Sequence, residues 1–153
     1  GLGYPLALTG VSQVAFSDAA SGDLVSANGR VVGATLIGQD FKNVPRYFQP
    51  RPSATDYAAN ATGFSNAGPN SADLRDALVE RAAAYLERER PYDPTLTRAG
   101  IPPDAVMTSA SNVDPHISPQ NAAIQARRVA RVRGLPLPRV PAPLDDFKRE
   151  ITM

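Results

Sequence analysis

The side chains best suited to chemistry lie together in the short segment Thr108–Pro119. It contains several hydroxyls, one carboxylate, Asp114, and the only histidine of the chain, His116. A hydrolase would need a serine within reach of His116 and an acid that orients the imidazole ring. Because Asp114 and Ser118 are close neighbours of His116 in the sequence, backbone geometry rarely lets them build a working triad. We therefore expect no catalytic residue here.

Two other interpretations of this segment stay open. In the first, Ser118 begins a helix whose free N–H groups bind a phosphate or another anion together with nearby polar side chains. The candidates for such a nucleotide or anion site are Ser109, Ser111, Asp114 and Ser118. In the second, Asp114 and Ser118 cap turns while His116 satisfies loop carbonyls. We favour the second interpretation.

Four arginines follow in the predicted helix that Ser118 begins, namely Arg127, Arg128, Arg131 and Arg133. Such a cluster could bind phosphates. However, no aromatic residues alternate with it, and the formal charge of the whole chain is only +1. Nucleic acid is therefore not expected as a partner, and we interpret the four side chains as one solvated helix face.

The composition excludes most metal and redox sites. The chain has no Cys and one His, so disulfides, thiolate sites and histidine clusters are ruled out. The carboxylates of Asp145, Asp146 and Glu150 are typical of a soluble surface rather than of a metal site. No phosphate-binding loop with the Gly-x4-Gly-Lys-Ser/Thr pattern is present. We expect no metal and no cofactor in the isolated domain, and we keep ATP open as the one alternative ligand.

Two helices are expected to position this segment. The first spans Ser71–Arg90, with Asn70 as its cap and Pro91 at its end. Its apolar residues fall on one face: Leu74, Leu78, Val79, Ala82, Tyr85 and Leu86. The second helix spans Ser118–Arg133, with Ser118 as cap, Pro119 in the first turn and Gly134 at the end.

The remaining elements predict an α+β fold with a small mixed sheet, the two helices and long ordered loops. The β-branched segments Gly29–Gly38 and Ala105–Thr108 indicate strands on which the helices pack. The stretch Gln39–Pro69 is long and aperiodic, but its aromatic residues favour an ordered loop. Arg51, between prolines, should tie this loop to the domain body or to a partner. A short helix is expected near Leu144–Glu150.

The hydropathy of the chain changes sharply after residue 16. Residues 1–16 carry no charged side chain and include seven large apolar ones, and a polar run starts at Ser17. A membrane-spanning helix needs about 20 apolar residues, so we interpret residues 1–16 as the outer end of a truncated N-terminal transmembrane helix. Residues 17–153 then form a soluble extracytoplasmic domain. A buried terminal segment is the alternative.

An ordered set of short motifs resembles one known family. The set comprises Tyr4-Pro5-Leu6 with Thr9 and Gln13, Leu36-Ile37-Gly38-Gln39, Phe41, Tyr47-Phe48, Arg51-Pro52-Ser53-Ala54, Ser65-Asn66 with Gly68-Pro69, and Asp114-Pro115-His116-Ile117-Ser118-Pro119. In this order it resembles KdpC, the C subunit of the Kdp potassium-transporting P-type ATPase. The resemblance covers roughly residues 4 to 133.

The resemblance implies an accessory subunit of a high-affinity, ATP-driven potassium uptake pump. Its partners would be a channel-like potassium-binding subunit, a P-type ATPase subunit, and the lipid bilayer through the missing helix. The chain would be a single-pass protein of the cytoplasmic membrane with its domain on the extracytoplasmic side, and no enzyme by itself. We expect it to stabilise or assemble the complex from that face. The alternative is a nucleotide-binding catalytic chaperone that raises the ATP affinity of the P-type subunit, a role that an outer-face domain could not perform on cytoplasmic ATP.

Six residues are our candidates for partner contact: Phe41, Tyr47, Phe48, Arg51, Asp114 and His116. The chain departs from the family pattern at Ala110 and Asn112, where glycines are usual, which weakens any phosphate-cradling role of this loop. It also departs in the tail, where residues 136–153 contain no apolar strand.

Overall fold

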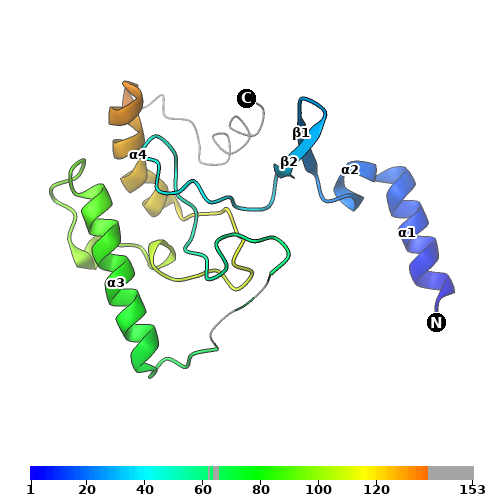
Figure 1. Cartoon of the computed structure of the whole chain (residues 1–153), viewed down its shortest axis with the longest axis horizontal. Coiled ribbons are helices and arrows are strands. Elements are labelled where there is room, and N and C mark those ends of the chain that lie inside the picture. Colours follow the sequence, from blue (N-terminus) through cyan, green and yellow to red (C-terminus); the bar gives the residue numbers. More distant parts are fainter. Residues whose placement is uncertain (62, 64–65, 138–153) are drawn as a thin grey trace. The chain divides into compact units, whose positions relative to one another are not determined.

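The structure, a computed structural model, describes residues 1–61, 63 and 66–137. It divides into two compact units, which within the described residues are 1–36, the N-terminal unit, and 37–137, the C-terminal unit. Figure 1 shows helices in both units, and strands in the N-terminal one. The fold is therefore mixed α and β, as expected.

The N-terminal unit contains two helices and one β-hairpin. Helix α1 spans Gly3–Ala15 and α2 spans Ser17–Ala20. Strands β1 (Leu24–Ala27) and β2 (Arg30–Ala34) are antiparallel, with Ala27 opposite Arg30. Asn28 and Gly29 connect them with φ angles of 51° and 74°, and a two-residue turn with both φ angles positive matches the twist of a hairpin. The strand expected within residues 29–38 is thus confirmed as β2.

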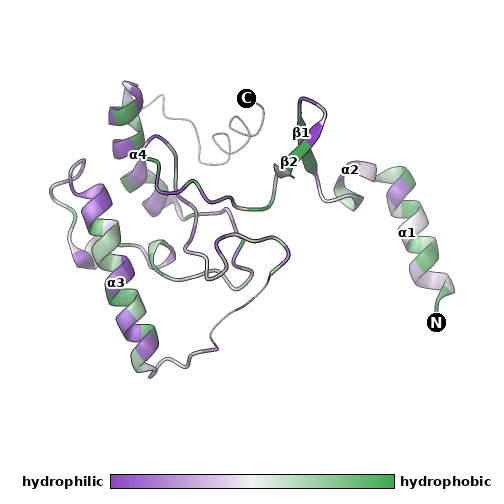
Figure 2. Cartoon of the chain, in the orientation of Figure 1, coloured by the Kyte–Doolittle hydropathy of each residue, from purple (hydrophilic) through white to green (hydrophobic). Residues whose placement is uncertain are grey.

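Helix α1 is apolar and exposed. All its residues except Ser12 are exposed, and in Figure 2 most of its ribbon has the white to green colours of residues that are not hydrophilic. Among the residues that the structure describes, no helix is both long and apolar enough to cross a membrane. The interpretation of residues 1–16 as part of a membrane helix stays a prediction.

The C-terminal unit is built on α3 (Ala72–Glu89) and α4 (Pro119–Arg133). Both predicted helices are confirmed. The cap of α3 is Ser71 rather than Asn70, because the Ser71 backbone is extended and its hydroxyl accepts from the Leu74 N–H at 3.3 Å. Ser118 caps α4 as predicted, accepting from the Asn121 N–H at 3.1 Å. Gly134 ends α4 in the left-handed region, with φ 65°.

The strand predicted at Ala105–Thr108 is wrong. A short 3-10 turn, η2 (Pro103–Ala105), overlaps the start of this segment, and another, η1 (Arg98–Gly100), precedes it. The Met107 N–H donates to the Pro103 carbonyl at 2.9 Å, which folds the chain back on itself instead of extending it. The only sheet within the described residues is the β1–β2 hairpin of the N-terminal unit. The predicted mixed sheet, with both helices packed on it, is therefore also wrong.

Both helices pack against each other and against the long loop of their own unit. The predicted apolar face of α3 is only partly buried. Ala82 and Tyr85 are buried, whereas Val79 is exposed. The three leucines of this face are half-buried, namely Leu74, Leu78 and Leu86. The loop brings Phe48 into this core at 5% exposure. In Figure 1 the cyan loop and the yellow segment before α4 run side by side, and the Gly38 N–H donates to the Val113 carbonyl at 2.6 Å.

The core between these parts is unusually polar. Its most deeply buried large side chains are Arg128, Gln125, Glu89, Val129, Asn112 and Asn121. The interpretation of four arginines as one solvated face is therefore wrong for Arg128, which is 1% exposed. Since buried polar groups need hydrogen-bond partners, the contacts of these residues decide how the unit is held together. The short helix near Leu144–Glu150, the carboxylates there, and the tail after Leu137 lie outside the described residues.

Candidate functional site

Arg128 joins the two helices to the long loop. Its Nε donates to both carboxylate oxygens of Glu89, each at 3.1 Å, and Glu89 also pairs with Arg88 Nε at 2.8 Å. Its Nη1 donates to the backbone carbonyls of Tyr47, at 2.9 Å, and Pro45. Burial lowers the pKa of Arg128, and the Glu89 carboxylate opposes that shift. The guanidinium thus fixes the proline-rich loop from within the core.

Gln125 clamps the same loop one turn earlier on α4. Its Oε1 accepts from the Gln49 N–H at 2.7 Å, and its Nε2 donates to the Gln49 carbonyl at 3.0 Å. This reciprocal pair satisfies the backbone of a buried loop residue as a strand neighbour would. Gln125 Nε2 and the Tyr85 hydroxyl both donate to Asn121 Oδ1, each at 2.9 Å. Tyr85 is thereby fixed to α4, and burial, with the nearby Glu89 charge, strongly raises its pKa.

The N-terminus of α4 already holds a carboxylate of this chain. Asp104 Oδ2 accepts from the Ser118 N–H and from Asn121 Nδ2, each at 2.9 Å. Burial raises the pKa of Asp104, but the hydrogen bonds from Ser118 and Asn121 outweigh that effect, so the pKa is lowered. A carboxylate is favoured at a helix N-terminus. The position at which we considered an external anion is therefore occupied from within.

Arg51 and Asp114 connect the long loop with the segment before α4. Arg51 Nη2 donates to the Thr108 carbonyl at 3.2 Å, and Nη1 lies 3.7 Å from Asp114 Oδ2. The expected tie of the loop to the domain body through Arg51 is confirmed. Asp114 Oδ1 also accepts from the His116 N–H at 3.0 Å and lies 2.7 Å from His116 Nδ1. Burial raises the pKa of Asp114, but the hydrogen bonds and charges of His116 and Arg51 lower it overall.

The predicted anion-site residues take up local structural roles. Ser109 is buried, Ser111 is exposed and accepts from the Val113 N–H at 3.3 Å, and the Ser118 hydroxyl caps α4. The expectation that Asp114 and Ser118 cap turns is confirmed. His116, with a side chain 64% exposed, pairs with Asp114 rather than with loop carbonyls.

Asn112 performs the task of a glycine at one of the two positions where the family pattern has glycine. Its φ angle of 61° lies in the left-handed region, which asparagine tolerates better than most residues. Its buried side chain accepts from the Ala54 N–H at 2.8 Å and donates to the Gly63 carbonyl. The Asn112 side chain therefore binds the long loop at Ala54 and at Gly63, which glycine, having no side chain, could not do.

The aromatic partner-contact candidates divide into one core residue and one surface cluster. Phe48 is buried in the core, whereas Phe41 and Tyr47 are half-buried with ring centroids 5.4 Å apart. The guanidinium groups of Arg46 and Arg133 lie 5.3 and 5.6 Å from the Tyr47 ring centroid. Phe48 thus has a structural role, and Phe41 and Tyr47 keep surface available for a partner.

Four further residues hold the site and were not predicted from the sequence, namely Glu89, Asn121, Gln125 and Asp104. A signal was present on α4, since Asn121, Gln125 and Arg128 recur at intervals of four and three. Such intervals place side chains on one helix face. A polar set on that face, beside Val129 and Ala130, indicates an inward stripe of hydrogen-bonding residues.

Comparison with known proteins gives consistent matches over most of the chain. The sequence model of the family described as "KdpC: K+-transporting ATPase, c chain" matches residues 1–150. The Potassium-transporting ATPase KdpC subunit of Cereibacter sphaeroides strain KD131 is 49% identical over 135 residues, covering 88% of this chain and 68% of that protein. The protein of the same description from Caulobacter sp. strain K31 is 49% identical over 148 residues, covering 95% and 71%.

Proposed function

Because the chain belongs to the KdpC family of K+-transporting ATPase c chains, we propose that it is a non-catalytic accessory subunit of a high-affinity potassium uptake pump. It stabilises or assembles the complex from the outer face of the membrane. The family match over residues 1–150 is the observation that carries this proposal. The partners are a channel-like potassium-binding subunit and a P-type ATPase subunit, and the apolar, exposed segment at residues 1–16 supports attachment to the bilayer.

The Asp104 carboxylate already lies at the N-terminus of α4, and this supports the role of an accessory subunit over that of a nucleotide-binding subunit. A nucleotide phosphate would be expected at such a helix end. There the Asp104 carboxylate accepts from the Ser118 N–H, and the Ser118 hydroxyl accepts from Asn121. A phosphate would have to displace a carboxylate of like charge. We therefore assign contacts with the large subunits to the exposed His116 and to the half-buried Phe41, Tyr47, Arg51 and Asp114.

The test uses cells that produce the two large subunits with or without this chain at its full length. We expect the tagged channel-like subunit to retain the P-type subunit, and cells to take up potassium at low external concentration, only when the chain is present. A fully assembled and active pump without the chain would overturn the proposal. Binding of a fluorescent ATP analogue to the full-length chain, with no change in assembly, would favour the nucleotide-binding role instead.

A further inference from the structure

A polar cavity lies between α3 and the long loop of the C-terminal unit. It has a volume of about 270 Å³, and three segments line it: α3, the loop between Asp40 and Tyr57, and the turn at Ala105. None of the candidate residues named from the sequence lines this cavity. The residues that α3 contributes are Arg81, Ala84, Tyr85 and Arg88. We call it the α3 cavity.

The α3 wall of the cavity carries two arginines that the protein holds in place. Arg81 and Arg88 are seven residues apart, so they lie on the same side of the helix and about 10 Å apart along its axis. The small Ala84 between them leaves room for a ligand. Arg81 Nη1 donates to the Val106 carbonyl at 3.2 Å, and Arg88 Nη1 donates to Asn43 Oδ1 at 3.0 Å. The two guanidinium groups are therefore fixed at separate points.

The positive charge of this wall is not cancelled within the chain. Arg81 makes no ion pair with any residue that the structure describes. Arg88 Nε lies 2.8 Å from Glu89, but the same carboxylate also pairs with the buried Arg128, so these three side chains together keep one positive charge. The wall thus has a surplus of two positive charges. Since a guanidinium carries five N–H donors, Arg81 and Arg88 both retain donors for an oxygen ligand.

The loop wall of the cavity carries one carboxylate, that of Asp40. Its Oδ1 accepts from the Lys42 N–H at 2.8 Å, and Asp40 makes no ion pair within the part of the chain that the structure describes. Burial raises the pKa of Tyr57, which also lines the cavity, to about 12; the charge of Asp40 adds to this effect and that of Arg88 opposes it. Because both charges act on the same hydroxyl, Asp40 and Arg88 face one cavity from opposite walls.

These charges define the ligand that the cavity suits. We propose that the α3 cavity binds a free α-amino dicarboxylate of the size of glutamate, with one carboxylate on Arg81, the other on Arg88 and the ammonium on Asp40. Arginine binds a carboxylate through two parallel hydrogen bonds, and the single net negative charge of such a ligand matches the net positive charge of the cavity. An acidic side chain of a partner protein would bring one carboxylate and no ammonium. The charge pattern, rather than the volume, therefore selects a free ligand.

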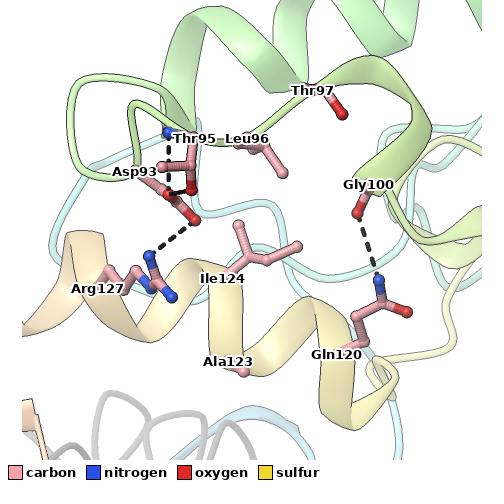
Figure 3. A pocket seen from close by; sticks show the side chains of 9 residues that line it. All are labelled: Asp93, Thr95, Leu96, Thr97, Gly100, Gln120, Ala123, Ile124 and Arg127. Carbon is pink, nitrogen blue, oxygen red and sulfur yellow. Dashed lines mark hydrogen bonds and ion pairs between the residues drawn. The ribbon is translucent and has the colours of Figure 1, made fainter.

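A second hollow of the same unit provides a comparison. It lies between α4 and the segment Asp93–Gly100, and Figure 3 shows its arginine, Arg127, joined to Asp93. Arg127 Nη1 lies 3.0 Å from Asp93 Oδ2, so the two charges cancel. We expect no acidic ligand there, and Arg127→Gln is therefore the matched control for the removal of an arginine from the α3 cavity.

The first experiment is isothermal titration calorimetry of L-glutamate with the purified full-length chain. Arg81→Gln should weaken binding at least tenfold, since it removes charge-assisted hydrogen bonds, and Arg127→Gln should leave the affinity unchanged. Glutarate, which has both carboxylates but no ammonium, should bind the native chain at least tenfold more weakly than glutamate. This comparison of two ligands decides the matter on the native chain even if Arg81→Gln does not fold.

The second experiment reverses the selectivity with Asp40→Asn. Asp40 is exposed, and asparagine keeps an oxygen that can accept from the Lys42 N–H, so the loop should retain its structure. In this variant glutamate should lose its advantage over glutarate. If the variant still prefers glutamate as strongly as the native chain does, the ammonium is not bound by Asp40 and the inference is overturned.

Three further results would also overturn the inference. The first is no binding of L-glutamate at about 10 mM, the weakest affinity expected for a ligand of this size. The second is equal affinity of the native chain for glutamate and glutarate. The third is binding of inorganic phosphate as tight as that of glutamate, which would indicate an unselective anion site. Since none of these measurements involves another subunit, the proposed function stands or fails separately.

Discussion

Arg128 and Glu89 form a fully buried ion pair between α4 and α3, with Arg128 Nε 3.1 Å from both oxygens of the Glu89 carboxylate. The two side chains are 1% and 0% exposed. A buried pair adds little net stability by itself, but removal of one partner leaves an uncompensated charge in the core. In this chain the loss would also free carbonyls of the long loop, so the pair controls more than the contact between the helices.

Arg128→Leu should therefore lower the free energy of unfolding by about 3–5 kcal/mol, measured by urea denaturation of the purified chain. Arg131→Leu, an exposed change on the same helix, should alter it by no more than about 0.5 kcal/mol. A loss below about 1 kcal/mol for Arg128→Leu would show that the pair can be replaced without damage to the core, contrary to our view.

Asp104→Asn should lower the free energy of unfolding at neutral pH and should lower it much less in acid. The lowered pKa of Asp104 means that the folded state binds the proton more weakly than the unfolded state. The resulting stability is present above the unfolded pKa of about 4 and is lost as the pH falls through the folded value. We expect a loss of about 1.5–3 kcal/mol at pH 7, typical of hydrogen bonds to a charged group. The difference from the native chain should shrink between about pH 5 and pH 3, as followed by thermal unfolding. Asp76→Asn, an exposed change, is the control.

Tyr57→Phe should alter the titration of the tyrosine hydroxyls of the folded chain at alkaline pH. Burial, with the nearby Asp40 charge, raises the pKa of Tyr57 to about 12, and its hydroxyl donates to the Arg51 carbonyl at 2.5 Å. Because the neutral phenol is favoured in the folded state, its contribution to stability is complete below about pH 10 and is lost as the pH rises towards 12. Phenolate absorbance should show one fewer late-titrating tyrosine in the variant. The late step of Tyr85 should remain in the folded variant, and in urea both chains should lose every late step. An unchanged number of late-titrating tyrosines in the folded variant would contradict the assignment.

Gly38→Ala should loosen the junction between the long loop and the segment before α4. A Cβ atom on Gly38 would lie 3.2 Å from the Val113 carbonyl oxygen and 3.5 Å from Pro115 Cα, both backbone atoms. The loop would have to shift, at a cost of about 1–3 kcal/mol, as in overpacked cores. Hydrogen exchange should become faster at the Gly38 junction and in the loop. Gly68→Ala, which meets nothing within 4 Å, should leave the exchange rates unchanged.

Local signals predicted the helices but not the interior of the C-terminal unit. Ser118, Pro119 and Gly134 mark the ends of α4 because caps depend on residues close in sequence. The β-branched residues of the segment Ala105–Thr108 predict a strand, yet the turn that follows Pro103 folds the segment back.

The role of Arg128 could not be predicted from its neighbours, since its partner Glu89 lies 39 positions away. Four arginines close together look alike in sequence, and only the packing of α4 on α3 buries one of them. The same holds for Phe48, whose burial depends on contacts of the loop with α4. The candidate partner contacts were predicted from residue type, and the structure distinguishes Phe48, which is buried, from the rest.

The clamp between Gln49 and Gln125 has a consequence for the order of events during synthesis. The two residues are 76 positions apart, and the contacts of Arg128 with Pro45 and of Arg133 with Arg46 span 83 and 87 positions. At about 5–20 residues per second, roughly 4–15 s pass between the emergence of Gln49 and that of Gln125. During that interval the proline-rich loop has no partner from α4 and is open to proteases. A chain that stops short of α4 would therefore be degraded from its middle, whatever the quality of the helix already formed at α3.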